Sequence, residues 1–192
     1  LPAIERALDL GATTLELDVG VTADGRVVVS HDATLNPAIT RDASGQWLQQ
    51  RGPRLKSVTF AELQAYDVGR IDPAVPYART FAAQEPRDGT RIPSLGQVFE
   101  LVKARNAQVR LNIETKLSPA QAEDTVSPEA MTDAVLKAVA DAGMGDRVTI
   151  QSFDWRSLRR VQQVAPAVPT AYLTSSNGND PAWTAGLPLA DH

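Results

Sequence analysis

The chain has 192 residues, of which 43% are hydrophobic and 22% charged, and its formal net charge is −4. These values are typical of an ordinary globular domain, and the acidic balance without a Lys/Arg cluster gives no support to nucleic-acid binding. The sequence contains no cysteine, which excludes structural disulfides and thiolate metal sites. No apolar run is long enough for a transmembrane segment. The oligomeric state stays open, and so does the compartment, for which a periplasmic or secreted location is favoured over a cytoplasmic one.

A helix is predicted at the start of the chain, over residues 2–10, with Pro2 at an early helical position and Gly11 as its stop. A helix that feeds a strand after a few residues is the second half of a βα unit. We therefore expect its preceding strand to lie upstream of Leu1, and the chain to be a processed or trimmed one.

A β-hairpin is predicted next. Residues 15–19 alternate so that Glu16 and Asp18 share one face of a strand and the apolar residues share the other. The Asp24-Gly25 pair indicates a turn, after which three valines lead back to His31. Two carboxylates and an imidazole at one end of a hairpin form a possible metal site with an acid/base group beside it. The competing interpretation is a half-buried strand whose polar face is merely solvated.

A long polar, turn-rich segment follows, over residues 33–92. Its capping box, from Thr59 to Glu62, predicts one helix that closes at Gly69. Loops of this length inside compact domains tend to be functional. Because the segment leaves directly from His31, we expect it to pack over the carboxyl ends of the strands and to shape a substrate pocket.

Helices and strands then alternate to the end of the predicted structure. They are a helix opened by a capping box at Ser94, a strand over 108–116, a helix over 128–143, a strand over 147–153, a helix over 155–164 and a strand over 169–173. This alternation predicts a parallel sheet covered by helices, in a doubly wound fold or a (β/α)8 barrel. The lack of a Gly-rich phosphate loop counts against nucleotide-binding sheets.

Polar residues near the carboxyl ends of strands are typical of barrel enzymes, whose complete barrels need about 250 residues. The predicted fold class is therefore α/β, an incomplete (β/α)8 TIM-type barrel. We expect one domain over residues 1–192, with the segment 33–92 as an insertion.

Three carboxylates on two predicted strands, those of Glu16, Asp18 and Glu114, suggest a site for one hard divalent cation, Mg²⁺ or Ca²⁺. Converging acids repel one another and raise at least one pKa unless a metal or Lys116 offsets their charge. The competing interpretation for Glu114 and Lys116 is an ordinary ion pair on a strand surface. His31 alone would more often be structural than catalytic, but its position toward the two acids favours a functional role.

Four blocks of the sequence resemble the glycerophosphodiester phosphodiesterase family. They are GATTLELDVGVTADGRVVVSHD, RIPSLGQVFELV, LNIETK and VTIQSFD, in that order. The resemblance implies a (β/α)8 barrel that hydrolyses glycerophosphodiesters to glycerol 3-phosphate and an alcohol. It implies that Glu16, Asp18 and Glu114 bind one Mg²⁺ or Ca²⁺, that His31 is one of two acid/base histidines, and that Lys116 contacts the phosphate.

The resemblance also departs from the family at both ends. The other histidine of the family lies in an H-R-G motif upstream of the first block, and this chain starts after that point. We therefore expect an internal piece that by itself hydrolyses glycerophosphocholine poorly or not at all. Two alternatives stay open: a related barrel phosphodiesterase acting on phospholipid headgroups, and a catalytically silent module that only binds phosphodiesters.

Overall fold

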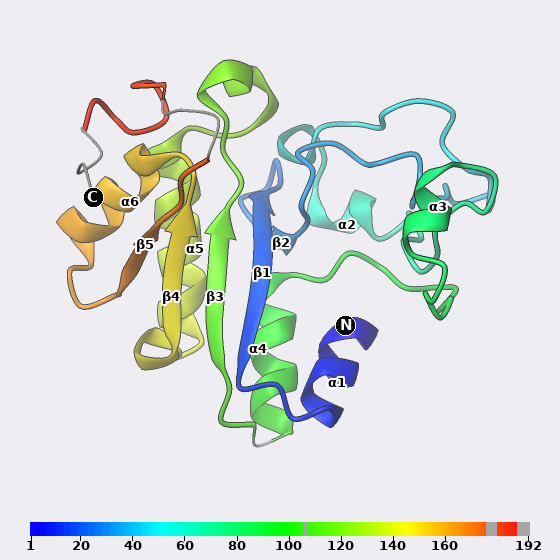
Figure 1. Cartoon of the computed structure of the whole chain (residues 1–192), viewed down its shortest axis with the longest axis horizontal. Coiled ribbons are helices and arrows are strands. Elements are labelled where there is room, and N and C mark those ends of the chain that lie inside the picture. The colour runs from blue at the N-terminus through cyan, green and yellow to red at the C-terminus, as the bar shows by residue number, and fades with distance from the viewer. Residues whose placement is uncertain (106, 176–179, 188–192) are drawn as a thin grey trace.

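A five-stranded sheet forms the centre of the molecule in the computed structural model, which describes residues 1–105, 107–175 and 180–187. Its strands lie in the order β2-β1-β3-β4-β5 (Figure 1). Their bounds are β1 (Thr14–Val21), β2 (Val27–Val29), β3 (Arg110–Thr115), β4 (Val148–Ser152) and β5 (Thr170–Tyr172). Strands β1, β3, β4 and β5 are parallel to one another, whereas β2 returns antiparallel to β1. The parallel sheet expected from the sequence is confirmed, and it is open within the described residues.

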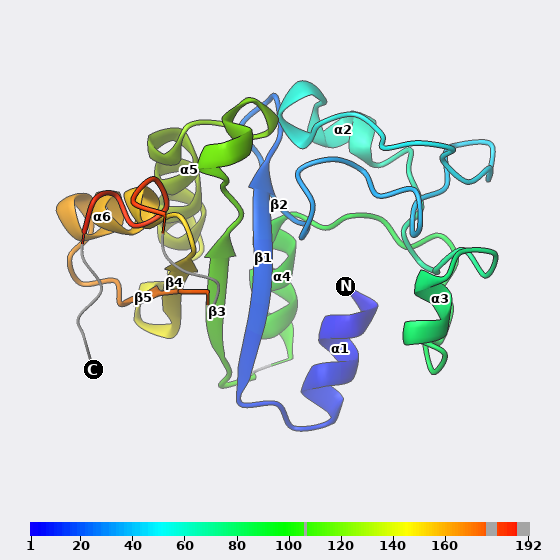
Figure 2. The same cartoon turned by 45° about the horizontal axis from the view of Figure 1, so that its top comes forward.

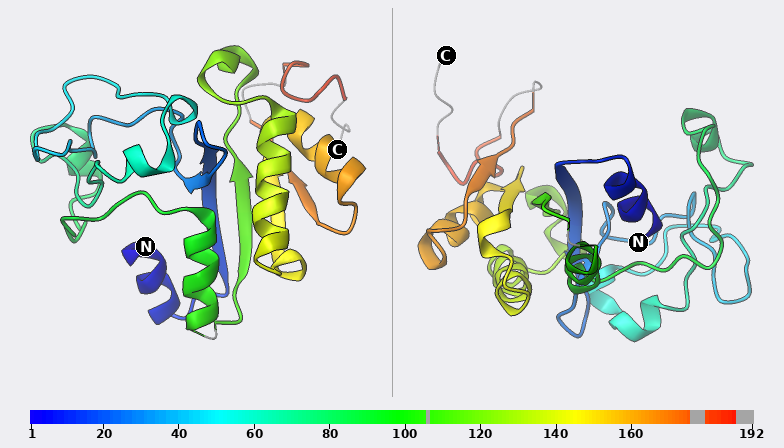
Figure 3. Two further views of the ribbon diagram at one scale, coloured as in Figure 1. Left: turned by 180° about the vertical axis from the view of Figure 1, so that it is seen from behind. Right: turned by 90° about the horizontal axis from the view of Figure 1, so that it is seen from below.

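Three helices cover one face of this sheet: α4 (Leu95–Ala104), α5 (Pro128–Asp141) and α6 (Trp155–Val164) (Figure 3, left). Alternate strand residues such as Leu17 and Ile113 point to that side and are buried with Phe99 of α4. The intervening strand residues, among them Glu16 and Glu114, therefore lie on the opposite face. The helix α1 (Pro2–Asp9) packs beside the start of β1 through partly buried apolar residues.

The helix starts follow the local signals of the sequence. Ser94 and Thr59 each form the predicted capping box, in which the hydroxyl accepts a backbone N–H and the third helical residue returns a bond to the cap. Ser127 and Asp154 cap α5 and α6 through side-chain bonds to Ala130 N and Arg156 N. Among the described residues, no helix is both long and apolar enough to cross a bilayer.

The insertion segment (residues 33–92) contains a 3-10 turn, η1 (Leu55–Ser57), and two short helices, α2 (Phe60–Leu63) and α3 (Tyr77–Thr80). The helix predicted to reach Gly69 is thus wrong in length, and η1 and α3 were not predicted. The chain leaves the helix after Leu63 because Tyr66 and Val68 turn back onto a small core around Leu63.

The inner part of the insertion segment is tied to the carboxyl end of the sheet. Arg54 Nε donates to Asp124 Oδ1 at 2.5 Å, and Lys56 Nζ donates to the carbonyl of Thr125 at 3.0 Å. Asp124 ends η2 (Pro119–Asp124), the 3-10 segment that follows β3. The outer part, which contains α3, extends away from the sheet on the side of β1 and β2 (Figure 2). Only the inner part lies where it can shape a pocket at the strand ends. A third 3-10 turn, η3 (Gly145–Arg147), leads into β4.

Candidate active site

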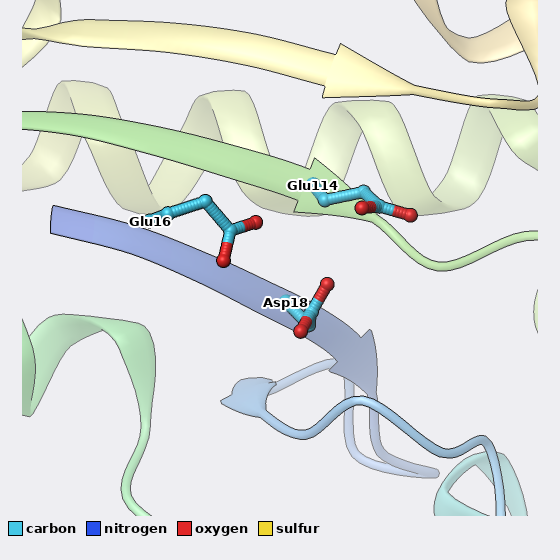
Figure 4. Close-up of side chains that lie close together, drawn as sticks. All are labelled: Glu16, Asp18 and Glu114. Carbon is cyan, nitrogen blue, oxygen red and sulfur yellow. The ribbon is translucent and has the colours of Figure 1, made fainter. Parts of the chain in front are cut away.

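The parallel pairing of β1 with β3 brings three carboxylates together. Asp18 lies opposite Glu114 in the register, and Glu16 lies opposite Asn112, two residues nearer the strand start. Carboxylate oxygens of Glu16, Asp18 and Glu114 all lie within 4.8 Å of one another, and Figure 4 shows the three side chains converging between the two strands. The structure therefore places these three predicted site residues in one cluster.

Lys116 lies directly beside the cluster. Its Nζ donates to Glu114 Oε1 at 2.8 Å and is 3.5 Å from Asp18 Oδ1. Burial by itself lowers the pKa of Lys116, but the hydrogen bond to Glu114 and the charges of Glu114 and Asp18 outweigh it and raise that pKa. The ion pair between Glu114 and Lys116 is thus present, but it faces the cluster rather than forming an ordinary surface pair.

The proximity of the three carboxylates affects the pKa of Glu16. Partial desolvation of its carboxylate, although the residue is exposed, and then the negative charges of Asp18 and Glu114 raise the pKa of Glu16 above its ordinary value. One ammonium group offsets three carboxylates only in part, which leaves a net negative site. The donor set consists of carboxylate oxygens alone, so the residues fit a hard divalent cation such as Mg²⁺ or Ca²⁺.

His31 follows β2 and faces the same region from the hairpin. The backbone N–H of Ser30 donates to the carbonyl of Asp18 at 2.9 Å, which holds the chain next to the acidic strand. The imidazole is 71% exposed, and its Nδ1 lies 3.2 Å from Asp32 Oδ1. Asp32 in turn accepts a bond from Asn36 Nδ2 at 2.9 Å. This contact engages Nδ1, so Nε2 is the nitrogen that can exchange a proton with a ligand.

A cavity of about 660 Å³ lies beside the carboxylate cluster, with His31, Glu114 and Lys116 in its lining. Its apolar wall comes from Leu117, Phe153, Trp155, Leu173 and Trp183. The insertion segment contributes Arg51, whose Nη1 donates to Thr34 Oγ1 at 3.2 Å. The cavity thus combines a charged end with an apolar wall, which suits a small polar ligand that also carries carbon surface.

Two polar residues on the sheet face that carries the three carboxylates were not assigned a role from the sequence. Gln151 of β4 donates through Nε2 to Glu16 Oε1 at 2.8 Å, and Asn112 of β3 donates through Nδ2 to Gln151 Oε1 at 2.6 Å. The alternation within residues 148–152 was the available signal, since it puts Gln151 on the face opposite the buried Ile150.

Comparison with known proteins identifies the family. A model of the glycerophosphoryl diester phosphodiesterase family matches residues 1–190, nearly the whole chain. The chain belongs to this family. Its resemblance to the glycerophosphodiester phosphodiesterases, which four sequence blocks had indicated, is confirmed.

Known proteins and solved structures match most of this chain. A glycerophosphodiester phosphodiesterase of Caldanaerobacter subterraneus subsp. tengcongensis is 31% identical over 86% of this chain and 56% of its own length. A solved structure of the same family name, from Silicibacter pomeroyi DSS-3, is 36% identical and has a TM-score of 0.86 over 94% of this chain and 61% of its own. A phosphodiesterase of Oleispira antarctica, solved with sn-glycerol 3-phosphate, shares the fold at 20% identity and a TM-score of 0.66, over 96% of this chain and 62% of its own.

These neighbours have the TIM-barrel fold, and the open sheet corresponds to part of such a barrel, as the sequence predicted. The chain spans somewhat more than half the length of the relatives that it matches.

Proposed function

We propose that the protein hydrolyses glycerophosphodiesters to glycerol 3-phosphate and an alcohol, with one divalent cation bound by Glu16, Asp18 and Glu114. The observation that carries this proposal is the convergence of the three carboxylates beside Lys116, next to a cavity whose lining includes Glu114, Lys116 and His31. The family of the chain and the names of its relatives support the same reaction class.

The phosphodiester would bind at the charged end of the cavity. A bound Mg²⁺ or Ca²⁺ would supply positive charge for the phosphate oxygens as negative charge develops on them in the transition state. Lys116 extends its ammonium group from the same cluster and would bind a nonbridging phosphate oxygen. This is the residue role that the family resemblance implies for it.

His31 would move a proton during cleavage of the P–O bond. Its Nε2 would either protonate the departing alcohol oxygen or remove a proton from the attacking nucleophile, which is water or the 2-hydroxyl of the substrate's glycerol, depending on which side of the phosphorus it occupies. The contact between Nδ1 and Asp32 orients the ring for either role. The family resemblance implies a second acid/base histidine, which would make the complementary proton transfer.

Release of glycerol 3-phosphate from glycerophosphocholine, followed with a coupled assay, tests this function in the full-length protein. We expect the wild-type protein to show turnover that EDTA abolishes and that added Mg²⁺ or Ca²⁺ restores. The Glu16→Gln variant should show no turnover. Turnover that is independent of metal would contradict the proposed mechanism.

Two other outcomes separate the alternatives. Hydrolysis of lysophosphatidylcholine but not of glycerophosphocholine would assign the site to phospholipid headgroups; mammalian relatives, 30–31% identical over 62% of this chain, are named lysophospholipase D. Binding of glycerol 3-phosphate without any turnover would identify a silent binding module.

A further inference from the structure

Glu16 is linked by hydrogen bonds to two neighbouring strands. Gln151 Nε2 of β4 donates to Glu16 Oε1 at 2.8 Å, and Asn112 Nδ2 of β3 donates to Gln151 Oε1 at 2.6 Å. In the sheet register, Gln151 stands opposite Glu114 and Asn112 stands opposite Glu16. The amide of Gln151 therefore reaches diagonally across β3 to the strand that carries two of the three acids.

The bond from Asn112 determines which way the Gln151 amide points. Its carbonyl oxygen is engaged by the Asn112 donor, so its NH₂ group is turned toward Glu16. The opposite orientation would set a carbonyl oxygen against a carboxylate oxygen and an NH₂ group against another NH₂ group. Asn112 thus selects the amide orientation that stabilises the Glu16 carboxylate in place.

The burial of Gln151 and Asn112 has a free-energy cost that a purely structural role would not explain. Gln151 is 7% exposed, and the Asn112 Oδ1 atom is buried without a hydrogen-bond partner among the described residues. Burying polar groups without full pairing destabilises a fold, and an apolar pair at these positions would avoid that cost. Polar groups that persist under such a cost are expected where a functional side chain must be held in one geometry.

We propose that Gln151, oriented by Asn112, is a positioning residue that holds the Glu16 carboxylate toward Asp18 and Glu114 and so pre-organises the cation site. The inference rests on the proposed function, because it takes the three carboxylates as the ligands of a divalent cation. Without the bond from Gln151, Glu16 would be repelled by the two neighbouring acids and would turn away from them. Hydrogen-bonding partners of metal ligands contribute about 10–100-fold to metal affinity, so the effect is measurable.

Terbium luminescence in the full-length protein tests this inference, with Tb³⁺ as the probe for an oxygen-ligated cation site. Titration measures affinity, and the lifetimes in H₂O and D₂O measure how many waters the bound ion carries. The test variant is Gln151→Met, which keeps the side-chain length and removes both hydrogen-bonding groups. The matched control is Thr149→Val, on the same face of β4 and two residues earlier. Glu16→Gln reports whether Glu16 is a ligand at all.

We expect Gln151→Met to bind Tb³⁺ about 10–100-fold more weakly and, at saturation, with an additional bound water. Thr149→Val should bind as the wild type does. A merely structural role would lower the melting temperature without changing the number of waters on the saturated ion. If Gln151→Met does not fold, Asn112→Leu takes its place, with the same direction of change.

The outcomes separate this inference from the proposed function. Wild-type affinity and hydration in Gln151→Met, together with weak binding in Glu16→Gln, would overturn the inference and leave the cation site intact. Wild-type binding in Glu16→Gln would instead overturn the proposed ligand set, and the positioning role with it.

Discussion

Asp18 and Glu114 are register partners on neighbouring parallel strands, and a single ammonium group, that of Lys116, contacts both of their carboxylates. Their relative position is set by the backbone pairing of β1 with β3 and not by flexible loops. Rigid strands hold catalytic and metal-binding groups more accurately than loops do. Substitutions in this pair should therefore change function much more than they change stability.

Replacement of Glu114 by Gln removes one carboxylate from the cluster while it keeps the size of the side chain. We expect weaker binding of Mg²⁺ or Ca²⁺ and a loss of glycerophosphodiesterase activity of about 10²–10³-fold, since charge stabilisation in the transition state is lost. Isothermal titration with Ca²⁺ and the coupled assay measure the two effects. Glu100→Gln, at an exposed position of α4, is the matched control and should behave as the wild type.

Replacement of His31 by Ala should separate activity from folding. General acid–base catalysis contributes about 10²–10⁴-fold, so we expect kcat to fall by that factor. The imidazole is 71% exposed and contacts only Asp32 among the hydrogen bonds and ion pairs of the described residues, so the melting temperature should stay within a degree or two, about the effect of a neutral surface change. Full activity of this variant would contradict the role proposed for His31.

Asp67 should make the outer part of the insertion segment sensitive to acid. Burial opposes the shift, but the backbone N–H groups of Gly89 and Gly69, together with Arg41, lower the pKa of Asp67 below its ordinary value. A carboxyl whose folded pKa is depressed stabilises the fold above its unfolded pKa, and this contribution is lost as pH falls through the folded pKa. We expect amide hydrogen-exchange protection of residues 67–89 to be retained at neutral pH and to fall below about pH 4.

Asp67→Asn provides the check on this pH dependence. It should destabilise the segment by about 1–3 kcal/mol at neutral pH, because hydrogen bonds to a charged acceptor are weakened, and it should flatten the acid dependence. Glu85→Gln changes a side chain that is 75% exposed, and it is the control expected to leave the profile unchanged. An acid profile that is the same in wild type and Asp67→Asn would assign the effect to other carboxyl groups.

The same substitution should have opposite effects at two glycines. A Cβ at Gly69 would lie 1.8 Å from the carbonyl oxygen of Arg87, whose own N–H donates to Gly69 O at 2.7 Å. Gly69→Ala should therefore push apart the two loop segments that carry Gly69 and Arg87, and it should destabilise the loop by about 2 kcal/mol or more. In α4, a Cβ at Gly96 meets only Ser94 Oγ at 3.7 Å, so Gly96→Ala should stabilise the protein by about 0.5–1 kcal/mol. Thermal denaturation of both variants measures the difference in sign.

Elements defined by short-range interactions were predicted correctly from the sequence. The capping boxes at Thr59 and Ser94 and the turn at Asp24-Gly25 involve residues at most four apart, so their signals are contained in the local pattern. The alternation in β1 likewise placed Glu16 and Asp18 on one face. The length of α2 was predicted wrongly because its end depends on where Tyr66 can pack, which is a contact of the folded core and not of the helix itself.

Contacts between distant residues depended on the tertiary structure. The sequence identified Glu16, Asp18, Glu114, His31 and Lys116 as candidates, and their catalytic and binding roles stay predictions. Only the pairing of β1 with β3 placed Glu114 opposite Asp18, and only the next pairing brought Gln151 to Glu16 across 135 positions of the chain. Side-chain periodicity specifies which face a residue occupies, but not which strand lies beside it or in what register. That choice is made by the burial of the whole apolar face against the helices, and the polar face follows it.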